Sequence, residues 1–581
     1  MIHLIKKINF LLNKSQKKYL IKLSVLLIFG MILEIFGLGI IVPLLSSILD
    51  PEFIDGIRDL SIINQFFEDI THNQILYLFL LTIIVIYVTK TFLLILITFK
   101  QNSFTTNLAA ELTLGLYSLY ISQPYSFHLN RNSATLIKNI QTEINLFRSF
   151  CMSFITSIVE SALLISIIGT LIYIEPIGAI SVAIFFSTFS FIIFKITKNK
   201  LKLWGDIREG LDEKINLNIF EGIGGIKDLM ILGRTDFYKK KLSLNSFFMA
   251  RIKRNHLTIS QIPRYSLELI SVLGLIIFIF SMLYFEKEIN EVIVILGVFV
   301  AATFRIIPSF NKVIASLQNM KYFTSSVELI FNEFKKLKIS QELSKINKYI
   351  SFTSKIEIKN LKFSYSNESE EVLKNINLTI SKGEFIGIIG QSGSGKSTLV
   401  DLIMGLLTPS KGSINFDDIN INSNKSSWQK IIGYVPQSIF LVDDSILNNI
   451  AFGIPNNEIN LSKINQAIKD SQLENYIDGL EKGLDTKAGE RGVQISGGQL
   501  QRIGIARALY DNPEILILDE STASLDSKTE SGVMNSIRKL KGSKTILMIS
   551  HRITSLKDCD HIYEIKNGIL SNQKSLIKDL I

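Results

Sequence analysis

The sequence predicts a chain of two unlike parts, an α-helical membrane-spanning region followed by an α/β domain that contains a phosphate-binding loop (P-loop). Three observations support this prediction. Six long apolar stretches occur within the first 317 residues, short β-rich and helical runs alternate from residue 352 onward, and a glycine-rich motif at 390–397 lies between a strand-like and a helix-like run. We therefore assign residues 1–335 to the membrane region, 336–350 to a polar linker and 351–581 to the α/β domain.

The composition also indicates a membrane protein. The 581 residues are 47% hydrophobic and have a mean hydropathy of +0.31, high for a chain that is only 10% aromatic. A formal net charge of +10 could indicate nucleic acid, but the bases lie beside the apolar spans, so we expect a lipid bilayer and no nucleic acid as partner. Cys151 and Cys559 fall in different parts of the chain, so we expect free thiols rather than a disulfide framework or a metal cluster.

The first apolar stretch, residues 23–49, is interrupted only by Glu34. It is too long for the core of a cleaved signal peptide, so we interpret it as a spanning helix. The five further predicted spans are residues 75–99, 149–174, 177–194, 264–285 and 292–317. With six spans, both termini lie on the same side of the membrane.

The charges of the connections orient the spans. Residues 50–74 contain six acids and one base, whereas residues 195–263 are rich in Lys and Arg, so the positive-inside rule places both termini in the cytoplasm. The inner connections 100–148 and 195–263 keep helical periodicity, and we expect them to extend the membrane helices into the cytoplasm. Each has a break near its middle, at Gln123-Pro124 and at 222–225, where a short helix could contact the α/β domain.

The outer connection carries apolar residues at helical spacing. Ile57, Leu60, Ile63, Phe67 and Ile70 define one face of an amphipathic helix. We expect this helix either to lie on the outer membrane surface or to pack against the protein itself.

The motif at 390–397 has the form G-x-x-x-x-G-K-[ST] and sits between the apolar run 385–389 and a helical pattern that starts at Thr398. A surface loop that spells the motif by chance would lack this context. Glycines let the backbone N–H groups converge on phosphate oxygens, the following helix adds its positive end, Lys396 reaches the β- and γ-phosphates, and Ser397 ligates Mg²⁺. The predicted phosphate-binding residues are Gly390, Gln391, Ser392, Gly393, Ser394, Gly395, Lys396, Ser397 and Thr398.

The apolar run 515–518 predicts a buried strand that ends in two carboxylates, Asp519 and Glu520. We expect Asp519 to hold Mg²⁺ through water and Glu520 to polarise the water that attacks a γ-phosphate. Many strands end in Asp, so this run alone is a weak signal. Its position 123 residues after Lys396 and shortly after the motif at 495–499 makes it a strong one.

The motif Ile495-Ser496-Gly497-Gly498-Gln499 resembles the signature of ATP-binding-cassette (ABC) transporters, which usually begins with Leu instead of Ile495. The resemblance implies that Ser496, Gly497, Gly498 and Gln499 form a second phosphate-binding helix N-terminus, and that ATP and Mg²⁺ are the cofactors of an α/β P-loop ABC ATPase domain. Other family motifs assign further positions: Tyr365 stacks on adenine, Gln437 senses the γ-phosphate and ligates Mg²⁺, 486–492 couples the two domains, 523–526 is the D-loop with Ala and Ser reversed, and His551 contacts the γ-phosphate. The alternative readings are an ordinary strand aromatic for Tyr365, a plain loop glutamine for Gln437 and a structural histidine for His551.

In that family the signature of one cassette meets the nucleotide held by the partner's phosphate loop. This chain has one cassette, so the resemblance implies a dimer, and two identical chains would give two competent sites. Six spans followed by one cassette is the layout of half-transporter exporters. We therefore expect a multi-pass protein of the bacterial inner (cytoplasmic) membrane.

Charged residues within spans are costly and usually functional. Lys90, Arg264, Arg305 and Lys312 lie in or at the ends of predicted spans and could bind an anionic headgroup. Alternatively they pair with Glu34, Glu160 and Glu268 or snorkel to the interface. The segments VTKTF, IPRYSLE and FRIIPSFNKVIAS are also similar to those of bacterial lipid-linked oligosaccharide flippases. That similarity implies export of a polyprenyl-pyrophosphate glycan from the inner to the outer leaflet.

Two other functions remain open at this stage. A multidrug, lipid or peptide exporter would share the architecture, and substrate-stimulated ATPase assays distinguish it from a glycan flippase. A sensor or ATP-gated channel belongs to a different class, and the intact set of predicted catalytic residues disfavours it.

Overall fold

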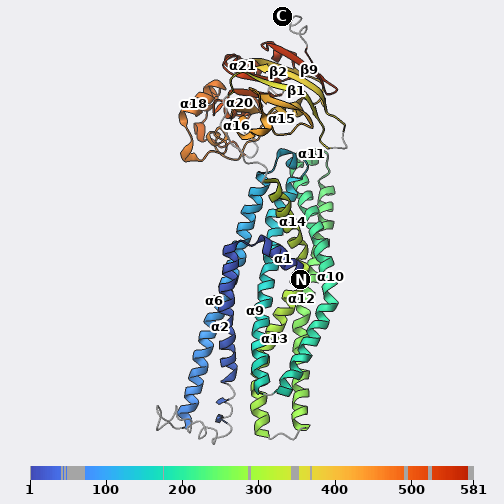
Figure 1. The fold of residues 1–581 in the computed structure, drawn as a ribbon, viewed down its shortest axis with the longest axis vertical. Helices are drawn as coiled ribbons and strands as arrows, with labels where there is room; N and C mark the ends of the chain where they lie inside the picture. Colours follow the sequence, from blue (N-terminus) through green and yellow to red (C-terminus); the bar gives the residue numbers. More distant parts are fainter. Residues whose placement is uncertain are drawn as a thin grey trace. The chain divides into compact units, whose positions relative to one another are not determined.

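The computed structural model describes residues 2–40, 43–44, 47–48, 72–174, 176–284, 289–341, 352–366, 370–489, 495–520 and 527–572. The chain divides into two compact units, of which the first comprises residues 1–123 and 128–343 and the second residues 124–127 and 344–581 (Figure 1). Most of the predicted linker, 342–350, and the predicted outer amphipathic helix lie outside the described residues.

The first unit is helical throughout its described part. Its long helices are α1 (Ile2–Leu11), α2 (Lys14–Gly39), α6 (His72–Ile121), α9 (Ile144–Ile174), α10 (Pro176–Gly224), α12 (Thr235–Tyr284), α13 (Ile289–Tyr322) and α14 (Thr324–Gln341). The short helices of this unit are α8 (Ser133–Lys138) and α11 (Ile226–Ile231), and a π-helical turn, η1, covers Asn139–Glu143. The short helix α7 (Tyr125–Leu129) is divided between the two units, with Tyr125–Phe127 in the second.

The predicted spans coincide with these helices. Within the described residues, Lys14–Gly37, Leu76–Ile121 and Ser133–Tyr173 are long and apolar enough to cross a membrane. The spans predicted at 177–194, 264–285 and 292–317 fall on α10, α12 and α13.

Helices α6, α10 and α12 have 50, 49 and 50 residues, well beyond the roughly 20 that cross a bilayer. The excess forms the predicted helical extensions. The predicted breaks are also present, since α6 ends at Ile121 just before Pro124, and α10 ends at Gly224 where Gly225 begins α11.

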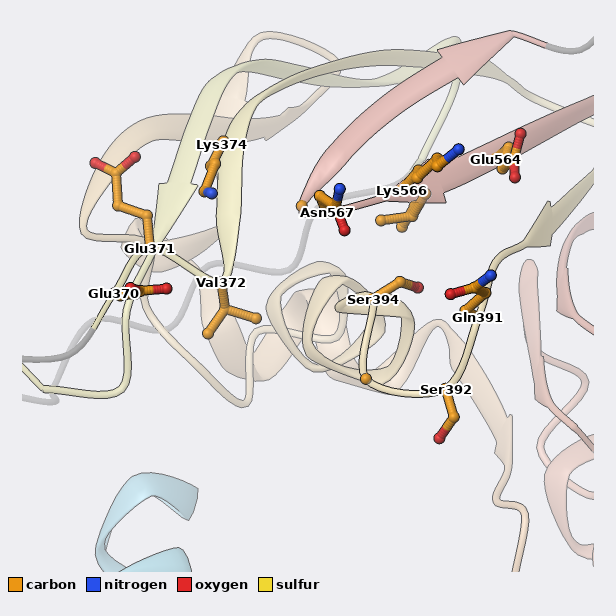
Figure 2. A pocket seen from close by; sticks show the side chains of 13 residues that line it. Glu370, Glu371, Val372, Lys374, Gln391, Ser392, Ser394, Glu564, Lys566 and Asn567 are labelled. Carbon is orange, nitrogen blue, oxygen red and sulfur yellow. The ribbon is translucent and has the colours of Figure 1, made fainter.

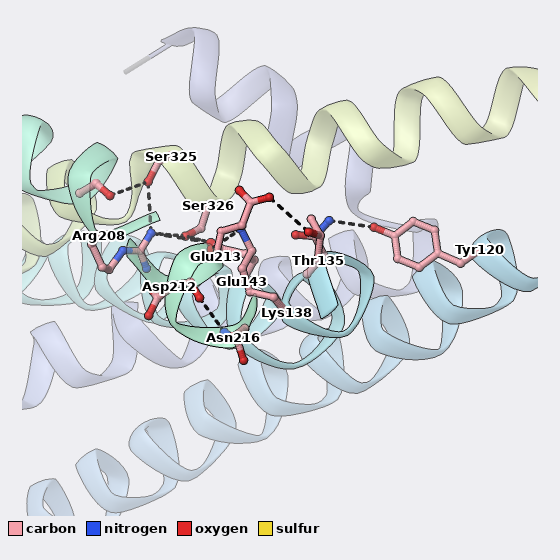
Figure 3. Close-up of polar contacts among 12 residues, drawn as sticks. Tyr120, Thr135, Lys138, Glu143, Arg208, Asp212, Glu213, Asn216, Ser325 and Ser326 are labelled. Carbon is pink, nitrogen blue, oxygen red and sulfur yellow. Dashed lines mark hydrogen bonds and ion pairs between the residues drawn. The ribbon is translucent and has the colours of Figure 1, made fainter. Parts of the chain in front are cut away.

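A buried polar network joins the extensions around Glu143, the last residue of η1 (Figure 3). Its carboxylate accepts a hydrogen bond from Ser326 Oγ of α14 at 2.6 Å. It also lies 3.7 Å from Arg208 Nη2 of α10 and 3.6 Å from Lys138 Nζ of α8. Glu143 and Arg208 are 0% and 1% exposed, so loss of either side chain would remove a charge partner from a place that water does not reach.

The second unit is the predicted α/β domain, built on two sheets. The four-stranded antiparallel sheet has the order β2-β1-β4-β5, and the six-stranded sheet has the order β10-β9-β3-β8-β7-β6. The strands are β1 (Lys355–Phe363), β2 (Leu373–Ser381), β3 (Phe385–Ile389), β4 (Lys411–Phe416), β5 (Ile419–Asn420), β6 (Ile432–Val435), β7 (Ile515–Asp519), β8 (Thr545–Ile549), β9 (His561–Lys566) and β10 (Ile569–Asn572).

The helices of this unit are α15 (Lys396–Ile403), α16 (Lys425–Lys430), α17 (Ile446–Ile450), α18 (Leu461–Asp470), α19 (Glu474–Asp478), α20 (Gly497–Leu509) and α21 (Ser527–Leu540). Strands β9, β3, β8, β7 and β6 are mutually parallel, and every residue of β7 and β8 is buried. Near-continuous apolar runs such as 515–518 suit strands covered on both faces. Because the carboxyl ends of parallel strands share one edge, the segments that follow β3, β8, β7 and β6 meet there.

Candidate functional site

The phosphate-binding loop connects β3 to α15 in the predicted way. Gly395, with φ +104°, precedes the first helical residue Lys396, and Gly393 has φ +79°, a region that favours glycine. At Gly390 a Cβ atom would lie 2.4 Å from the carbonyl oxygen of Ile565 in β9. The loop therefore closes tightly against the neighbouring strand, and only glycine fits at its first position.

The loop lysine is bonded to its own loop. Lys396 Nζ donates hydrogen bonds to the carbonyl oxygens of Gly390 at 2.9 Å and Gln391 at 3.0 Å. Burial lowers the pKa of Lys396, while the nearby Glu520 and Asp519 carboxylates oppose that shift. The ammonium group is thus held over the loop, where phosphate oxygens could replace the two carbonyl acceptors.

A cavity of about 580 Å³ lies along the loop, within the roughly 300–1,000 Å³ typical of small-molecule sites (Figure 2). Its walls are residues 391–394 of the loop, residues 370–372 and Lys374 around the start of β2, and residues 564–568 at the end of β9 and the turn that follows. Three of these residues, Glu370, Glu371 and Glu564, are acidic. Within the described part of the chain, Ser394 Oγ is buried and has no hydrogen-bond partner. A polar ligand in this cavity could satisfy it.

Tyr365 lies beside the first turn of α15. Its hydroxyl is 3.0 Å from Thr398 Oγ1, and its ring meets Phe363 edge-on with centroids 5.0 Å apart. The side chain is 52% exposed, which leaves ring surface on which a base could stack.

The three predicted catalytic side chains meet at the carboxyl edge of the sheet. Glu520 follows β7, and its Oε2 accepts a hydrogen bond from Gln437 Nε2 at 2.8 Å. Its Oε1 lies 2.7 Å from His551 Nε2. Gln437 follows β6 and His551 follows β8, so one loop from each of three adjacent strands contributes to the site. Glu520 itself has φ +47°, a strained conformation that turns the carboxylate out of the strand direction.

Asp519 ends β7 and is only 8% exposed. Burial raises its pKa, the adjacent Glu520 raises it further, and Lys396 and a hydrogen bond from Tyr434 oppose the shift. Burial and the nearby Asp519 also raise the pKa of Asp401 to about 6. Negative charges held this close in a buried place favour binding of a cation.

The residues around Asp519 fit a magnesium ion. Mg²⁺ prefers oxygen ligands and is commonly held by one or two carboxylates together with water and substrate phosphates. Oxygen ligands of that kind are the hydroxyl of Ser397, the amide oxygen of Gln437 and the carboxylate of Asp519. Sequence reasoning gave no role to Tyr434 or Asp401, although Tyr434 stands in the quoted YVPQ motif and Asp401 lies five residues beyond Lys396.

The motif at 495–499 forms a well-capped helix N-terminus. Ser496 is the N-cap of α20, and its Oγ accepts from the Gln499 backbone N–H at 3.4 Å while Gln499 Oε1 accepts from the Ser496 N–H at 3.1 Å. Ser496 and Gly497 are exposed, and nothing lies within 4 Å of a Cβ placed on Gly497. A phosphate group could approach the first turn of α20 closely. The predicted D-loop and residues 490–492 of the coupling segment lie outside the described residues.

Three of the four predicted substrate cations, those whose side chains the structure describes, are paired with carboxylates. Lys90 Nζ lies 3.0 Å from Glu34 Oε1, with the two residues 8% and 1% exposed. Lys312 Nζ lies 2.7 Å from Glu160 Oε1. Within the described residues these cations form separate ion pairs rather than one uncompensated cluster.

Of the remaining two predicted substrate residues, Arg264 and Arg305, the structure describes the side chain of Arg264. Arg264 Nε lies 3.3 Å from Glu268 Oε1 on the exposed face of α12. The partners are thus the acids that the sequence analysis named as the alternative. The side chain of Arg305 lies outside the described residues.

Comparisons with known proteins agree with this arrangement. Residues 373–523 match the family model described as "ABC transporter". A putative export ATP-binding/permease protein of Rickettsia typhi is 34% identical over 277 residues, which is 47% of this chain and 46% of the relative. The ATP-dependent lipid A-core flippase of Pasteurella multocida is 38% identical over 228 residues, covering 39% of this chain and 38% of the flippase.

A third relative is the alpha-hemolysin translocation ATP-binding protein of Escherichia coli O157:H7, 40% identical over 217 residues, 37% of this chain and 30% of that protein. The alignments thus span less than half the length of each of these relatives. A solved structure of a bacterial Atm1-family ABC exporter with ATP bound matches with a TM-score of 0.77 and 17% identity, covering 96% of this chain and 95% of that one. Residues 373–523 therefore resemble the ABC transporter family, and the chain as a whole has the fold of an ABC exporter.

Proposed function

We propose that this chain is one half of a symmetric, ATP-driven exporter that hydrolyses ATP and moves a lipid-linked anionic glycan across the membrane. The observation that carries the ATPase proposal is the position of Glu520, held between Gln437 and His551 on the edge of the sheet that also carries the Lys396 loop. A carboxylate in that position can orient a water molecule for attack on a γ-phosphate.

Each side chain of the site has a role in this proposal. Lys396 exchanges its two loop carbonyls for β- and γ-phosphate oxygens, while Tyr365 stacks on the adenine. Ser397, Gln437 and Asp519 are the residues that would hold Mg²⁺, which supplies positive charge opposite the phosphates when bound. Glu520 accepts a hydrogen bond from the attacking water, and His551 and Gln437 hold its carboxylate in place.

The proposed dimer is based on the N-terminus of α20. Ser496 and Gly497 are exposed, and Ser496 already caps its own helix, so this helix end can receive phosphate from outside the chain. Two identical chains would bring this end of α20 opposite the partner's phosphate loop. We place the dimer in the bacterial inner membrane with both termini in the cytoplasm, following the distribution of Lys and Arg.

The proposed substrate is a polyprenyl-pyrophosphate oligosaccharide, moved from the inner to the outer leaflet. Two lines of support are the similarity of three membrane segments to lipid-linked oligosaccharide flippases and the relative named as a lipid A-core flippase. Because Lys90, Arg264 and Lys312 are ion-paired, a pyrophosphate group would have to replace a carboxylate at these positions. Toxin export is the second candidate, since another relative is named for alpha-hemolysin translocation.

Reconstituted proteoliposomes test the proposal. A panel of fluorescent lipid-linked oligosaccharides is added to the vesicles. The ATP-dependent loss of these lipids from the leaflet on the side of the cassettes is measured together with ATP hydrolysis. We expect flipping that requires ATP and is absent in Glu520→Gln. Hydrolysis without flipping of any panel member, together with ATP-dependent uptake of a polypeptide, would refute the glycan substrate and leave the ATPase assignment intact. Absence of hydrolysis would refute both.

A further inference from the structure

An apolar cavity of about 390 Å³ lies among the N-terminal helices, remote in sequence from the nucleotide-binding residues. Its walls come from α1, α2, α6 and α9. Apart from Asn9, Lys17, Ser24 and the Cys151 thiol, every side chain that lines it is a hydrocarbon. The chemistry of the cavity therefore suits a hydrocarbon ligand.

Specific polar contacts hold the walls in place on the side of the α1–α2 turn. Asn13 Nδ2 and Gln16 Nε2 both donate to Glu111 Oε2 of α6, at 3.0 and 2.7 Å. Tyr19, three residues after Gln16, stacks on Phe104 with ring centroids 5.7 Å apart. These contacts fix α2 against α6 at this end of the cavity.

Helix α1 is fixed separately, on α14. Phe10 meets Phe331 edge-on with centroids 5.3 Å apart, and Lys7 Nζ lies 3.7 Å from Glu328 Oε1. Since α1 and α2 are anchored to different helices, the space between them and α9 is held open by both anchors.

The cavity has a buried floor and an exposed apolar mouth. Leu27, Phe104 and Leu108 at the floor are 9%, 6% and 2% exposed. Ile21 and Ile158 at the mouth are 66% and 48% exposed. An apolar chain can therefore enter from the surroundings of the helices and continue inward among side chains that water does not reach.

The charge near this cavity is positive. Lys17 is half-buried in its wall, and residues 1–22 contain six lysines and no acid. A cluster of four to eight bases on an amphipathic helix or at the cytoplasmic end of a spanning helix attracts anionic lipids, by roughly 1 kcal/mol per base. A ligand with a hydrocarbon chain and an anionic head complements both features.

We propose that this cavity binds one acyl chain of an anionic membrane phospholipid, with the headgroup phosphate beside Lys17. The lipid is a resident ligand rather than the transported molecule. It fills the space between α1, α2 and α9 and completes the packing of the N-terminal helices on α6.

Photo-crosslinking of the full-length protein tests this assignment. The protein is reconstituted in phosphatidylcholine vesicles that contain either phosphatidylglycerol or phosphatidylcholine with the same diazirine-bearing acyl chain, and labelled peptides are identified by mass spectrometry. We expect the phosphatidylglycerol probe to label peptides of α2 and α9 about fivefold more, the factor that corresponds to roughly 1 kcal/mol from one base. Equal labelling by the two probes would overturn the anionic headgroup.

Matched variants separate the cavity from general lipid contact. Ser24→Phe, which fills the cavity from α2, should lower labelling of α2 and α9 by either probe, and Cys151→Phe should do so from α9. Val25→Phe places the same side chain at a neighbouring exposed position that does not line the cavity, and should leave labelling unchanged. Lys17→Gln should reduce the phosphatidylglycerol signal to the phosphatidylcholine level.

Labelling that resists both filling variants, each checked for a monodisperse profile and wild-type ATP hydrolysis, would refute the cavity as the binding place. Stronger competition by a polyprenyl phosphate than by unlabelled phosphatidylglycerol would also overturn the proposal, because the cavity would then hold the tail of a substrate-like lipid. Weaker competition by the polyprenyl phosphate is the result we expect.

Discussion

His551 Nε2 lies 2.7 Å from Oε1 of Glu520, whose second oxygen is bonded to Gln437. Each carboxylate oxygen thus has one partner from a neighbouring loop. Because a carboxylate oxygen can accept more than one hydrogen bond, these two contacts orient Glu520 and still allow it to accept a water molecule, so its direction depends on the loops that carry Gln437 and His551.

The first prediction concerns Glu520→Gln. The variant keeps Lys396 and the whole phosphate loop, so we expect ATP affinity within about twofold of wild type. Steady hydrolysis should fall by at least about 100-fold, because a positioned base contributes roughly 10²–10⁴ to such a reaction. Phosphate release and nucleotide retained on the purified dimer are the measurements. Glu514→Gln, at the opposite end of β7, is the matched control, and near wild-type turnover by Glu520→Gln would remove Glu520 from the catalytic role.

The second prediction uses the close packing of the phosphate loop. In Gly390→Ala the new methyl would lie 2.4 Å from the Ile565 carbonyl oxygen, so the loop must shift. We expect ATP affinity to fall at least about tenfold, a loss of 1.4 kcal/mol or more. Gly393 has φ +79° and open space around it. Gly393→Ala should therefore lower the free energy of unfolding only by the roughly 1–2 kcal/mol that a left-handed backbone conformation costs a residue with a side chain. Equal ATP affinity of the Gly390→Ala variant and wild type, by equilibrium nucleotide binding, would contradict the steric argument.

The third prediction concerns pH and Asp401, whose pKa burial and Asp519 raise to about 6. A carboxyl group that binds its proton more tightly in the folded protein than in the unfolded chain makes the free energy of unfolding fall with rising pH. The fall runs from the pKa in the unfolded chain, about 4, to the pKa in the folded protein, and the stability stays reduced above that pH. Asp401→Asn, which carries no charge, should therefore stabilise the cassette by about 1–3 kcal/mol at about pH 7.5 and by much less at about pH 4.5. Thermal unfolding of the detergent-solubilised protein at both pH values measures this. An identical shift at the two pH values would show that the charge of Asp401 is not responsible.

The fourth prediction separates two roles of Lys90. If its pair with Glu34 is structural, Lys90→Ala removes the ammonium group that faces a buried carboxylate and should destabilise the membrane unit by about 3–5 kcal/mol, whereas adding Glu34→Gln should restore most of the loss. If Lys90 binds the substrate headgroup, Lys90→Ala with Arg305→Ala should remain in the membrane and hydrolyse ATP normally while glycan flipping falls steeply. Expression level, basal hydrolysis and flipping, measured together, distinguish these results. Normal flipping by a stable double variant would eliminate the anionic-headgroup role.

The membrane helices and the cassette strands follow directly from patterns in the sequence. Apolar stretches of span length have few other physical outcomes, and alternating β-rich and helical runs around the motif at 390–397 predict a parallel sheet with its site at one edge. The roles of Gln437 and His551 came from the family resemblance and that of Glu520 from the strand before it, but their meeting was not predicted, since they lie far apart in the sequence and strand order is not a local property. In the structure they follow β6, β8 and β7, which are neighbours in the sheet.

Other features could not be predicted for identifiable reasons. The sequence left open whether Lys90 faces a substrate or a carboxylate, because that choice depends on the rotation of α6 against α2, and no pattern of hydropathy fixes a rotation. The π-helical turn at Asn139–Glu143 could not be predicted either, since its composition is that of an ordinary helix. Its last residue contacts Arg208 and Ser326, which lie on helices distant in the sequence. The pKa shift of Asp401 depends on its burial and on the charge of Asp519, which lies more than a hundred residues away in the sequence.

Helices α6 and α10 have no proline after their first residue, whereas α12 contains Pro263 and α13 contains Pro308. An unbroken hydrogen-bond ladder makes the first two behave as stiff rods about 75 Å long, so a tilt of about 5° at one end displaces the other by roughly 6–7 Å. Proline removes a ladder bond and lets a helix bend locally. We therefore expect a displacement of the long extensions to be transmitted along the full length of α6 and α10. Helices α12 and α13 can bend at their prolines and should transmit only part of it.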